Sequence, residues 1–88
     1  MFIKNCDKLV DFYSILANPY RLKIISLISR QPLSQKEISI IIGLNYMVTY
    51  RYLKMMTNKN IVKKIKSNNT TLFKSLIKIN EKGEIIKL

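Results

Sequence analysis

Residues 33–58 have the sequence LSQKEISIIIGLNYMVTYRYLKMMTN, and this stretch decides the fold. Ser34 and Glu37 have the spacing of a capping box, in which each side chain accepts a hydrogen bond from a backbone N–H that the start of a helix leaves free. Gly43 is the residue type that most readily takes the left-handed conformation at the end of a helix. The pattern therefore predicts a short helix between Ser34 and Gly43.

A second helix is predicted directly after this glycine. Asn45 can cap it, and we expect it to run from about Tyr46 to Asn58. Residues at helical spacing give each helix one side that we expect to be buried: Ile38, Ile41 and Ile42 in the shorter helix, and Thr49, Tyr52, Leu53 and Met56 in the longer one. A helix, a tight glycine turn and a second helix form the helix-turn-helix pattern.

Two further helices are predicted before this motif. Asn18 and Pro19 have the order of an N-cap and a proline at the first helical position, and Pro32 ends the helix that they begin after about Arg30 or Gln31. The helix before it runs from Asp7 to Leu16, because one stripe carries apolar residues at positions i, i+3, i+4 and i+7: Leu9, Phe12, Tyr13 and Leu16.

The sequence after Asn60 changes to the pattern of strands. Residues 61–66 and 72–79 flank Asn68 and Asn69, which favour a tight turn, so a β-hairpin is predicted over about residues 61–79. Asn80 is expected to cap a last helical turn with Ile85, Ile86 and Leu88. Residues 1–88 are thus expected to form one α+β domain, mostly α, which is a winged helix-turn-helix with four helices, a two-stranded β-hairpin wing and a short C-terminal helical tail.

The charge balance indicates a polyanion as the partner. The chain has 88 residues with 16 Lys and Arg against 5 Asp and Glu, a net charge of +11, and such an excess attracts nucleic acid or anionic membrane. A solvated face usually mixes both signs, but eight cations occur without an acid between Glu37 and Glu81: Arg51, Lys54, Lys59, Lys63, Lys64, Lys66, Lys74 and Lys78. They do not lie on one face of a long helix, so nucleic acid is favoured over a membrane.

The composition excludes several kinds of chemistry. The chain has no His, so neither His-dependent catalysis nor imidazole metal ligation is available. The five carboxylates are scattered, and the single Cys6 can neither form an intrachain disulfide nor bind zinc alone. We therefore expect no enzyme activity, no metal and no cofactor. Residues 1–10 lack the pattern of a secretory signal, and no apolar stretch reaches the roughly 20 residues that span a bilayer, so a cytoplasmic protein is expected.

Two stretches carry a resemblance to a known family. Residues 15–28, ILANPYRLKIISLI, resemble the L-A-(D/N)-P-x-R-L-x-I-L opening of ArsR-type winged helix-turn-helix repressors. Residues 44–56, LNYMVTYRYLKMM, followed by NIV at 60–62, are similar to that family's recognition helix, L-S-x-x-x-V-S-x-H-L-x-x-L and G-L-V. Residues 79–83, INEKG, are more similar to the L-T-x-x-G that ends the wing in MarR-like winged helices. The resemblance covers about residues 9–79 and implies a DNA-binding regulator.

The sequence also departs from that family. Its metal-sensing members carry Cys-x-Cys in the third helix, or His and carboxylate ligands on the last helix, and this chain has neither, so metal sensing is not expected. The family's long C-terminal dimerisation helix is reduced to about eight residues after Asn80. A dimer is therefore expected to depend more on the first helix.

The helix over about residues 46–58 is expected to enter the major groove of double-stranded DNA, which is about 12 Å wide. Arg51 can bond both acceptors of a guanine, and the aromatic and Met side chains can contact thymine methyls or phosphates. The wing is expected to follow the backbone or the minor groove, and the amides at the start of the third helix to hold a phosphate. The predicted DNA-binding residues are Gln35, Lys36, Asn45, Tyr46, Met47, Tyr50, Arg51, Lys54, Lys63, Lys64, Lys66, Asn68, Asn69 and Lys74.

The N-terminal region predicts a homodimer. It carries more apolar residues than one helix of a small monomer needs, so a symmetric pairing of the two first helices is expected, through Phe2, Ile3, Leu9, Phe12, Tyr13 and Leu16. Cys6 lies near this interface, either as a free thiol or in a disulfide between subunits.

The predicted function is that of a sequence-specific regulator of transcription that binds double-stranded DNA, most simply as a dimeric repressor that occludes a promoter. Two alternatives stay open. One is a non-specific protein that coats DNA or RNA, because charge alone does not separate it from a specific reader. The other is a winged helix that binds proteins through its apolar first helix.

Overall fold

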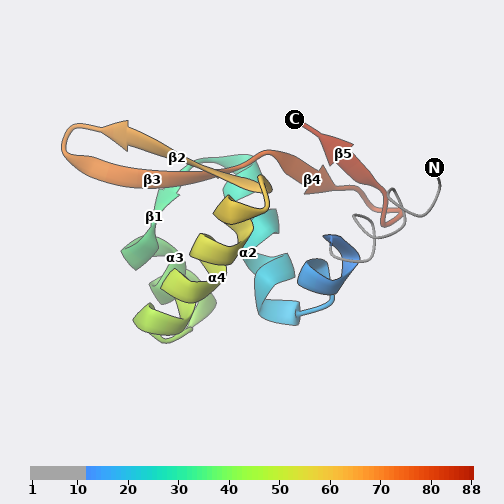
Figure 1. Ribbon diagram of the computed structural model, residues 1–88, viewed down its shortest axis with the longest axis horizontal. Helices are drawn as coiled ribbons and strands as arrows, with labels where there is room; N and C mark the ends of the chain where they lie inside the picture. The colour runs from blue at the N-terminus through green and yellow to red at the C-terminus, as the bar shows by residue number, and fades with distance from the viewer. Residues whose placement is uncertain (1–11) are drawn as a thin grey trace.

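The computed structural model describes residues 12–88 of the chain (Figure 1). Residues 12–16 are helical and form the end of the predicted first helix, whose earlier part lies outside the described residues. The elements that follow are α2 (Pro19–Arg30), β1 (Leu33–Ser34), α3 (Gln35–Ile42), α4 (Tyr46–Asn58), β2 (Val62–Ser67), β3 (Thr70–Ser75), β4 (Ile77–Ile79) and β5 (Ile85–Lys87).

Helix α2 has the bounds that the sequence predicts, and it lies at the centre of the fold. The Asn18 side chain accepts hydrogen bonds from the backbone N–H groups of Tyr20 and Arg21, and Pro19 occupies the first turn, where its missing N–H costs no hydrogen bond. The fully buried side chains of α2 are Ile24, Ile25 and Ile28. They pack in one core with residues from α3, α4, the segment that joins α4 to β2, and the strands, including Ile38, Leu53, Met56, Ile61 and Phe73.

The predicted helix-turn-helix is confirmed. The capping box of Ser34 and Glu37 begins α3, and Gly43 ends it with φ at 74°. The Asn45 side chain accepts hydrogen bonds from the N–H groups of Met47 and Val48 and thereby begins α4.

The prediction that Ile41 points inward is wrong, because 58% of its surface is exposed. Successive residues of a helix are about 100° apart, and the side of α3 that faces the core carries Ile38, Ile42 and Ser39. Ile41 therefore lies beyond the edge of that side, while Ile38 is buried and Ile42 is partly buried against the core.

The predicted wing is an antiparallel hairpin of β2 and β3, whose register runs from Val62 opposite Ser75 to Ser67 opposite Thr70. Asn68 and Asn69 form the two-residue turn, both with positive φ, as the common type I′ hairpin turn requires. The wing is shorter than the predicted 61–79, because β3 ends at Ser75. The sheet also has a third strand, β1, which pairs with β3 and was not predicted.

The predicted C-terminal helical tail is wrong, because the segment forms a second antiparallel hairpin of β4 and β5. Asn80 caps its turn instead of a helix: the side-chain oxygen accepts hydrogen bonds from the N–H groups of Lys82 and Glu84, and the Asn80 N–H donates to the Glu84 carbonyl. Gly83 supplies the positive φ, 79°, that this turn needs. Figure 1 shows the wing and this C-terminal hairpin at opposite ends of the molecule.

Ser75 separates the two hairpins. Its side chain is fully buried, and its hydroxyl donates a hydrogen bond to the Ile77 carbonyl and accepts one from the Ile77 N–H. The next residue, Leu76, donates its N–H to the Ile61 carbonyl. This hydrogen bond holds the junction between β3 and β4 against the segment that follows α4.

We expect Ser75→Ala to lower the free energy of unfolding by about 1–3 kcal/mol, because it leaves the buried N–H and C=O of Ile77 without the partner that the hydroxyl provides. Urea titration followed by circular dichroism measures this loss. Ser67→Ala is the matched control, since Ser67 is exposed in β2 and should change stability by less than about 0.5 kcal/mol. Equal effects of the two substitutions would contradict the role assigned to Ser75.

Candidate nucleic-acid interface

Helix α4 buries one side and exposes the other. Thr49, Leu53 and Met56 are fully buried. The exposed side carries the six residues of this helix and its cap that the sequence predicted to contact DNA: Asn45, Tyr46, Met47, Tyr50, Arg51 and Lys54. Met47, with 56% of its surface exposed, is the clearest departure from the usual burial of Met. The exposed side therefore presents aromatic, thioether and cationic groups along one stripe.

Two side chains on this stripe are positioned by contacts within the protein. The Lys54 ammonium lies 5.9 Å from the centre of the Tyr50 ring, within the range of a cation–π contact. The Asn45 side-chain oxygen is occupied by its cap, so its amide nitrogen is the group that remains for an outside acceptor.

A cluster around Tyr52 anchors α4 on α2. The Arg21 guanidinium lies 5.1 Å from the centre of the Tyr52 ring and donates a hydrogen bond to the Met55 sulfur, and the Asn18 amide donates to the Tyr52 hydroxyl. Tyr52 is accordingly half-buried and packs against the core, as the sequence predicted, while Tyr50 is exposed. The contacts fix the angle at which α4 presents its outer side.

The basic residues of the wing lie on both of its faces. Lys64 is opposite Phe73 and lies on the face directed toward α3 and α4, whereas Lys63 and Lys74 are opposite one another on the other face. All of them are exposed. Two like charges directly across a strand pair destabilise it, so the Lys63 and Lys74 pair lowers the stability of the free wing.

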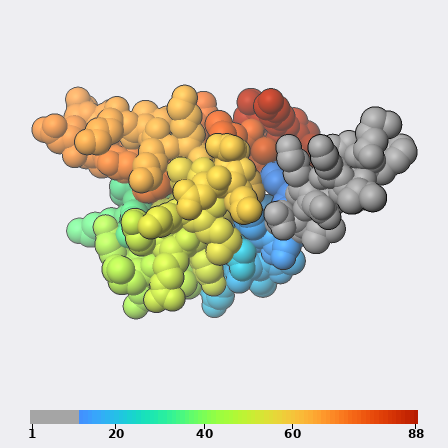
Figure 2. Space-filling model, in the orientation of Figure 1, coloured from blue at the N-terminus to red at the C-terminus, as the bar shows by residue number. Residues whose placement is uncertain are grey.

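A groove of about 530 Å³ lies between the wing and the first turns of α3 and α4. It brings together six of the predicted DNA-binding residues: Gln35, Lys36, Tyr46, Tyr50, Lys64 and Asn69. Figure 2 shows the wing projecting over α3 and α4. The other predicted residues lie outside this groove, on the outer side of α4 or along the wing: Asn45, Met47, Arg51, Lys54, Lys63, Lys66, Asn68 and Lys74.

The groove also contains four residues that were not predicted as contacts: the buried Phe73 at its base and the hydroxyl residues Ser34, Thr70 and Thr71. The two threonines follow directly on the Asn68–Asn69 turn. Their place beside the predicted tip of the wing is the feature of the sequence that could have identified them as contacts. Gln35 has an additional role, because its amide donates a hydrogen bond to the Tyr46 carbonyl over 3.3 Å and so joins the starts of α3 and α4. The side chains lining the groove are hydroxyls, amides, ammonium groups and aromatic rings, without a carboxylate among them.

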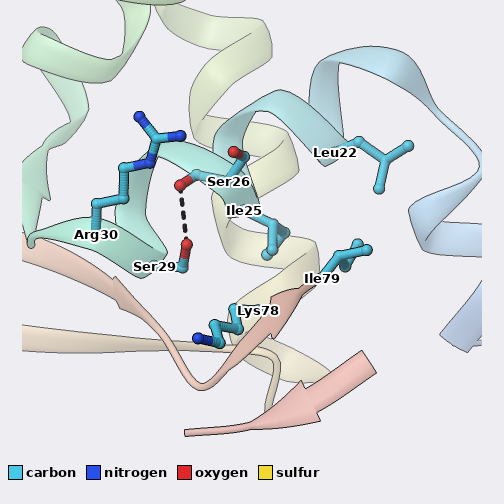
Figure 3. A pocket seen from close by; sticks show the side chains of 7 residues that line it. All are labelled: Leu22, Ile25, Ser26, Ser29, Arg30, Lys78 and Ile79. Carbon is cyan, nitrogen blue, oxygen red and sulfur yellow. Dashed lines mark hydrogen bonds between the residues drawn. The ribbon is translucent and has the colours of Figure 1, made fainter. Parts of the chain in front are cut away.

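A second hollow of about 520 Å³ lies between α2 and β4 and shares no residue with the groove (Figure 3). It is lined by Leu22, Ile25, Ser26, Ser29, Arg30, Lys78 and Ile79, and the Ser29 hydroxyl is hydrogen-bonded to the Ser26 carbonyl. Residues 12–88 contain no group of three or more acidic or Cys side chains placed to hold a metal ion. None of the helices described has the length and hydropathy needed to cross a bilayer.

The predicted dimer residues divide into three groups. Phe2, Ile3, Leu9 and the neighbouring Cys6 lie outside the described residues. Leu16 packs in the core and exposes only 6% of its surface, so little of it is left for a partner. Phe12 is partly buried against the core, and Tyr13 exposes 57% of its surface.

Comparison with known proteins extends this description. The sequence matches no protein-family model and no curated protein. Three solved structures illustrate the similarity of the fold. HlyU from Vibrio cholerae is 25% identical with a TM-score of 0.74, over 82% of this chain and 78% of its own. An ArsR-like transcriptional regulator from Rhodococcus is 14% identical with a TM-score of 0.76, over 83% of this chain and 69% of its own.

The third structure is the homodimeric winged helix-turn-helix DNA-binding domain of Mb0332 from Mycobacterium bovis, which is 18% identical with a TM-score of 0.74. The alignment covers 83% of this chain and 68% of that one. The resemblance to ArsR-type proteins is thus confirmed at the level of the fold, which is a winged helix-turn-helix.

We expect Gly43→Ala and Gly83→Ala to lower stability by about the same amount, roughly 1–2 kcal/mol each, because both glycines have positive φ and an added methyl group at either meets no atom within 4 Å. Urea titration of both variants measures the two losses. A much larger loss for Gly43→Ala would mean that the turn between α3 and α4 cannot keep its shape with a side chain present.

Proposed function

We propose that this protein is a DNA-binding regulator of transcription that reads double-stranded DNA in a sequence-specific manner. The observation that carries this proposal is the convergence of three elements on one surface. The exposed side of α4, the start of α3 and the basic wing all border the groove beneath the wing, which carries cations and hydrogen-bond donors without a carboxylate. The fold, which it shares with proteins described as transcriptional regulators, supports the same reading.

The exposed side of α4 would lie in the major groove, with its N-terminal residues toward the bases, as in other helix-turn-helix proteins. Arg51 can donate to both acceptors of a guanine, and Tyr46, Met47 and Tyr50 offer apolar surface to thymine methyls. Lys54, held near the Tyr50 ring, would contact a phosphate. This division assigns sequence reading to the first half of α4 and contact with the phosphate backbone to Lys54, which follows it.

The groove beneath the wing would receive the phosphate backbone. Lys36 and Lys64 provide charge, and Thr70 and Thr71 provide short hydroxyl donors on its walls. The Asn68–Asn69 tip would reach a minor groove, while Lys63, Lys66 and Lys74 strengthen the attraction to phosphates. A binding role is proposed in preference to catalysis, because the ammonium groups, amides and hydroxyls that line the groove bind anions, and no carboxylate lies among them to act as a general base.

A homodimer that acts as a repressor in the cytoplasm is the form of this function that we propose. The homodimeric state described for the Mb0332 domain supports it. Two copies related by a two-fold axis would bind a palindrome and occlude a promoter that overlaps it.

A second candidate function is non-specific coating of DNA or RNA, which is favoured by the pairing of Lys63 with Lys74 and by the net charge of +11. Selection from a pool of random duplexes separates the two functions. A sequence-specific reader enriches one motif, since each wrong base pair costs about 1–3 kcal/mol, and a coating protein enriches none.

We expect replacement of Lys63, Lys64 and Lys66 by Gln to weaken duplex binding and to reduce the slope of log K against log salt by about 2 to 3, because each lost phosphate contact removes about 0.9 from it. Fluorescence anisotropy over a salt series measures the slope. The matched control replaces three exposed lysines that lie outside the wing and α4 by Gln: Lys23, Lys78 and Lys82. Equal losses for both triples would mean that net charge matters and the wing does not.

We expect Arg51→Ala to abolish the preference at one base pair of the selected motif, a loss of about 1–3 kcal/mol in discrimination there. Lys54→Ala is the control one helical turn further on, and it should weaken binding to all sequences alike. Competition with duplexes that carry single base changes measures both effects. An Arg51→Ala variant that keeps the full base preference would assign the reading to another residue.

A further inference from the structure

Strand β5 forms an open edge at the end of the molecule opposite the wing (Figure 1). Two hydrogen bonds show which residues of this segment direct their backbone groups toward β4. The Leu88 N–H donates to the Leu76 carbonyl, and the Asn80 N–H donates to the Glu84 carbonyl. Glu84 and Leu88 therefore face β4, and so does Ile86, which lies midway between them opposite Lys78. Backbone groups alternate sides along an antiparallel strand. The N–H and C=O groups of Ile85 and Lys87 therefore point away from β4.

The structure closes the other edge of this hairpin where it enters the core. The Ile77 N–H and C=O point away from β5, and both are hydrogen-bonded to the buried Ser75 hydroxyl. Ile85 and Lys87 have no such cap within residues 12–88. An edge strand with unpaired backbone groups is a template for pairing with another strand.

Apolar surface surrounds this open edge. Leu88 exposes 52% of its surface, and Ile86 is also exposed. A hollow of about 480 Å³ extends from β5 to the helical residues 12–16, and its lining includes Phe12, Leu76, Ile85 and Leu88. The edge and the end of the first helix therefore form one continuous surface on which a partner could bury apolar groups.

The charge of this surface favours a second copy of the chain as the partner. Two molecules that each carry a charge of +11 repel one another, most strongly where the wing lysines gather. Around the β4–β5 hairpin, Glu81 and Glu84 offset two of the three lysines, Lys78, Lys82 and Lys87. Among the described residues, repulsion between two copies is therefore weaker at this end than at the wing, and Figure 2 shows the hairpin away from the tip of the wing.

We propose that two copies of the chain pair their β5 strands in antiparallel fashion about a two-fold axis at Ile86. Ile85 of each copy then lies opposite the partner's Lys87, and their outward N–H and C=O groups form the hydrogen bonds of a continuous sheet in the order β4, β5, β5, β4. The two Ile86 side chains meet at the axis. This inference specifies the homodimer of the proposed function, and it is tested without DNA, so that either proposal can fail alone.

A cysteine at the axis tests the pairing directly. Residues opposite one another without mutual hydrogen bonds have Cα atoms about 4.5 Å apart, a distance that a disulfide can span. In a Cys6→Ser background, we expect Ile86→Cys to form a covalent dimer under mild oxidation, seen on a non-reducing gel. Ser67→Cys in the exposed wing is the matched control and should stay monomeric.

The same gel identifies the competing arrangement. If Tyr13→Cys forms the covalent dimer and Ile86→Cys does not, the copies associate through their first helices and the proposal is overturned. A protein that is monomeric by light scattering at 100-fold above the concentration used for DNA binding overturns it as well.

A proline at the open edge provides a second test, because it removes only one backbone donor. Lys87→Pro deletes the outward N–H and leaves the bonds between β4 and β5 intact, whereas Lys87→Ala removes the same charge and keeps the N–H. A symmetric pair would lose two hydrogen bonds, so we expect the dissociation constant of the dimer to be about 10- to 100-fold higher for Lys87→Pro than for Lys87→Ala by analytical ultracentrifugation. Equal constants would overturn the proposal.

Discussion

The left-handed turn at Gly43 is the constraint on which the rest of the surface depends. The N–H groups of Gly43 and Leu44 both donate to the Ser39 carbonyl, and Asn45 then begins α4 two residues after the glycine. The turn is therefore too short to leave the direction of α4 free. The bond from Gln35 to the Tyr46 carbonyl joins the two helix starts, and the Arg21–Tyr52 contact fixes the other side of α4 on the central helix. The outer side of α4 is thus presented by a rigid support.

Local chemistry explains which parts of this fold could be predicted. Asn18, Ser34, Gly43 and Asn45 begin or end helices through contacts with residues at most four positions away, so the sequence around each is sufficient. The Asn68–Asn69 turn belongs to the same group. Six residues of the groove could be predicted for the same reason, since the start of α3, α4 and the lysine-rich wing are each recognisable from short stretches.

Tertiary contacts explain the errors. Strand β1 has two residues and exists only because β3 lies beside it. The break at Leu76 depends on a hydrogen bond to Ile61, fifteen positions earlier, and on a serine hydroxyl that acts within the core. Asn80 is an equally good cap for a helix or for a hairpin turn, and the pairing of β5 with β4 decides between them. Only the position of the wing over α3 brings Ser34 together with Thr70 and Thr71, which lie far from it in the sequence.

The two-residue turn at the tip of the wing has a consequence for the entropy of binding. A long flexible loop would have to be ordered when it meets a ligand, at about 1–2 kcal/mol for each residue whose backbone becomes fixed. Here Asn68 and Asn69 already hold left-handed conformations that the paired strands on either side maintain. The tip is thus preorganised and has little conformational freedom to lose on binding. The attraction of its neighbouring lysines to a polyanion therefore contributes to affinity almost without an opposing entropy cost.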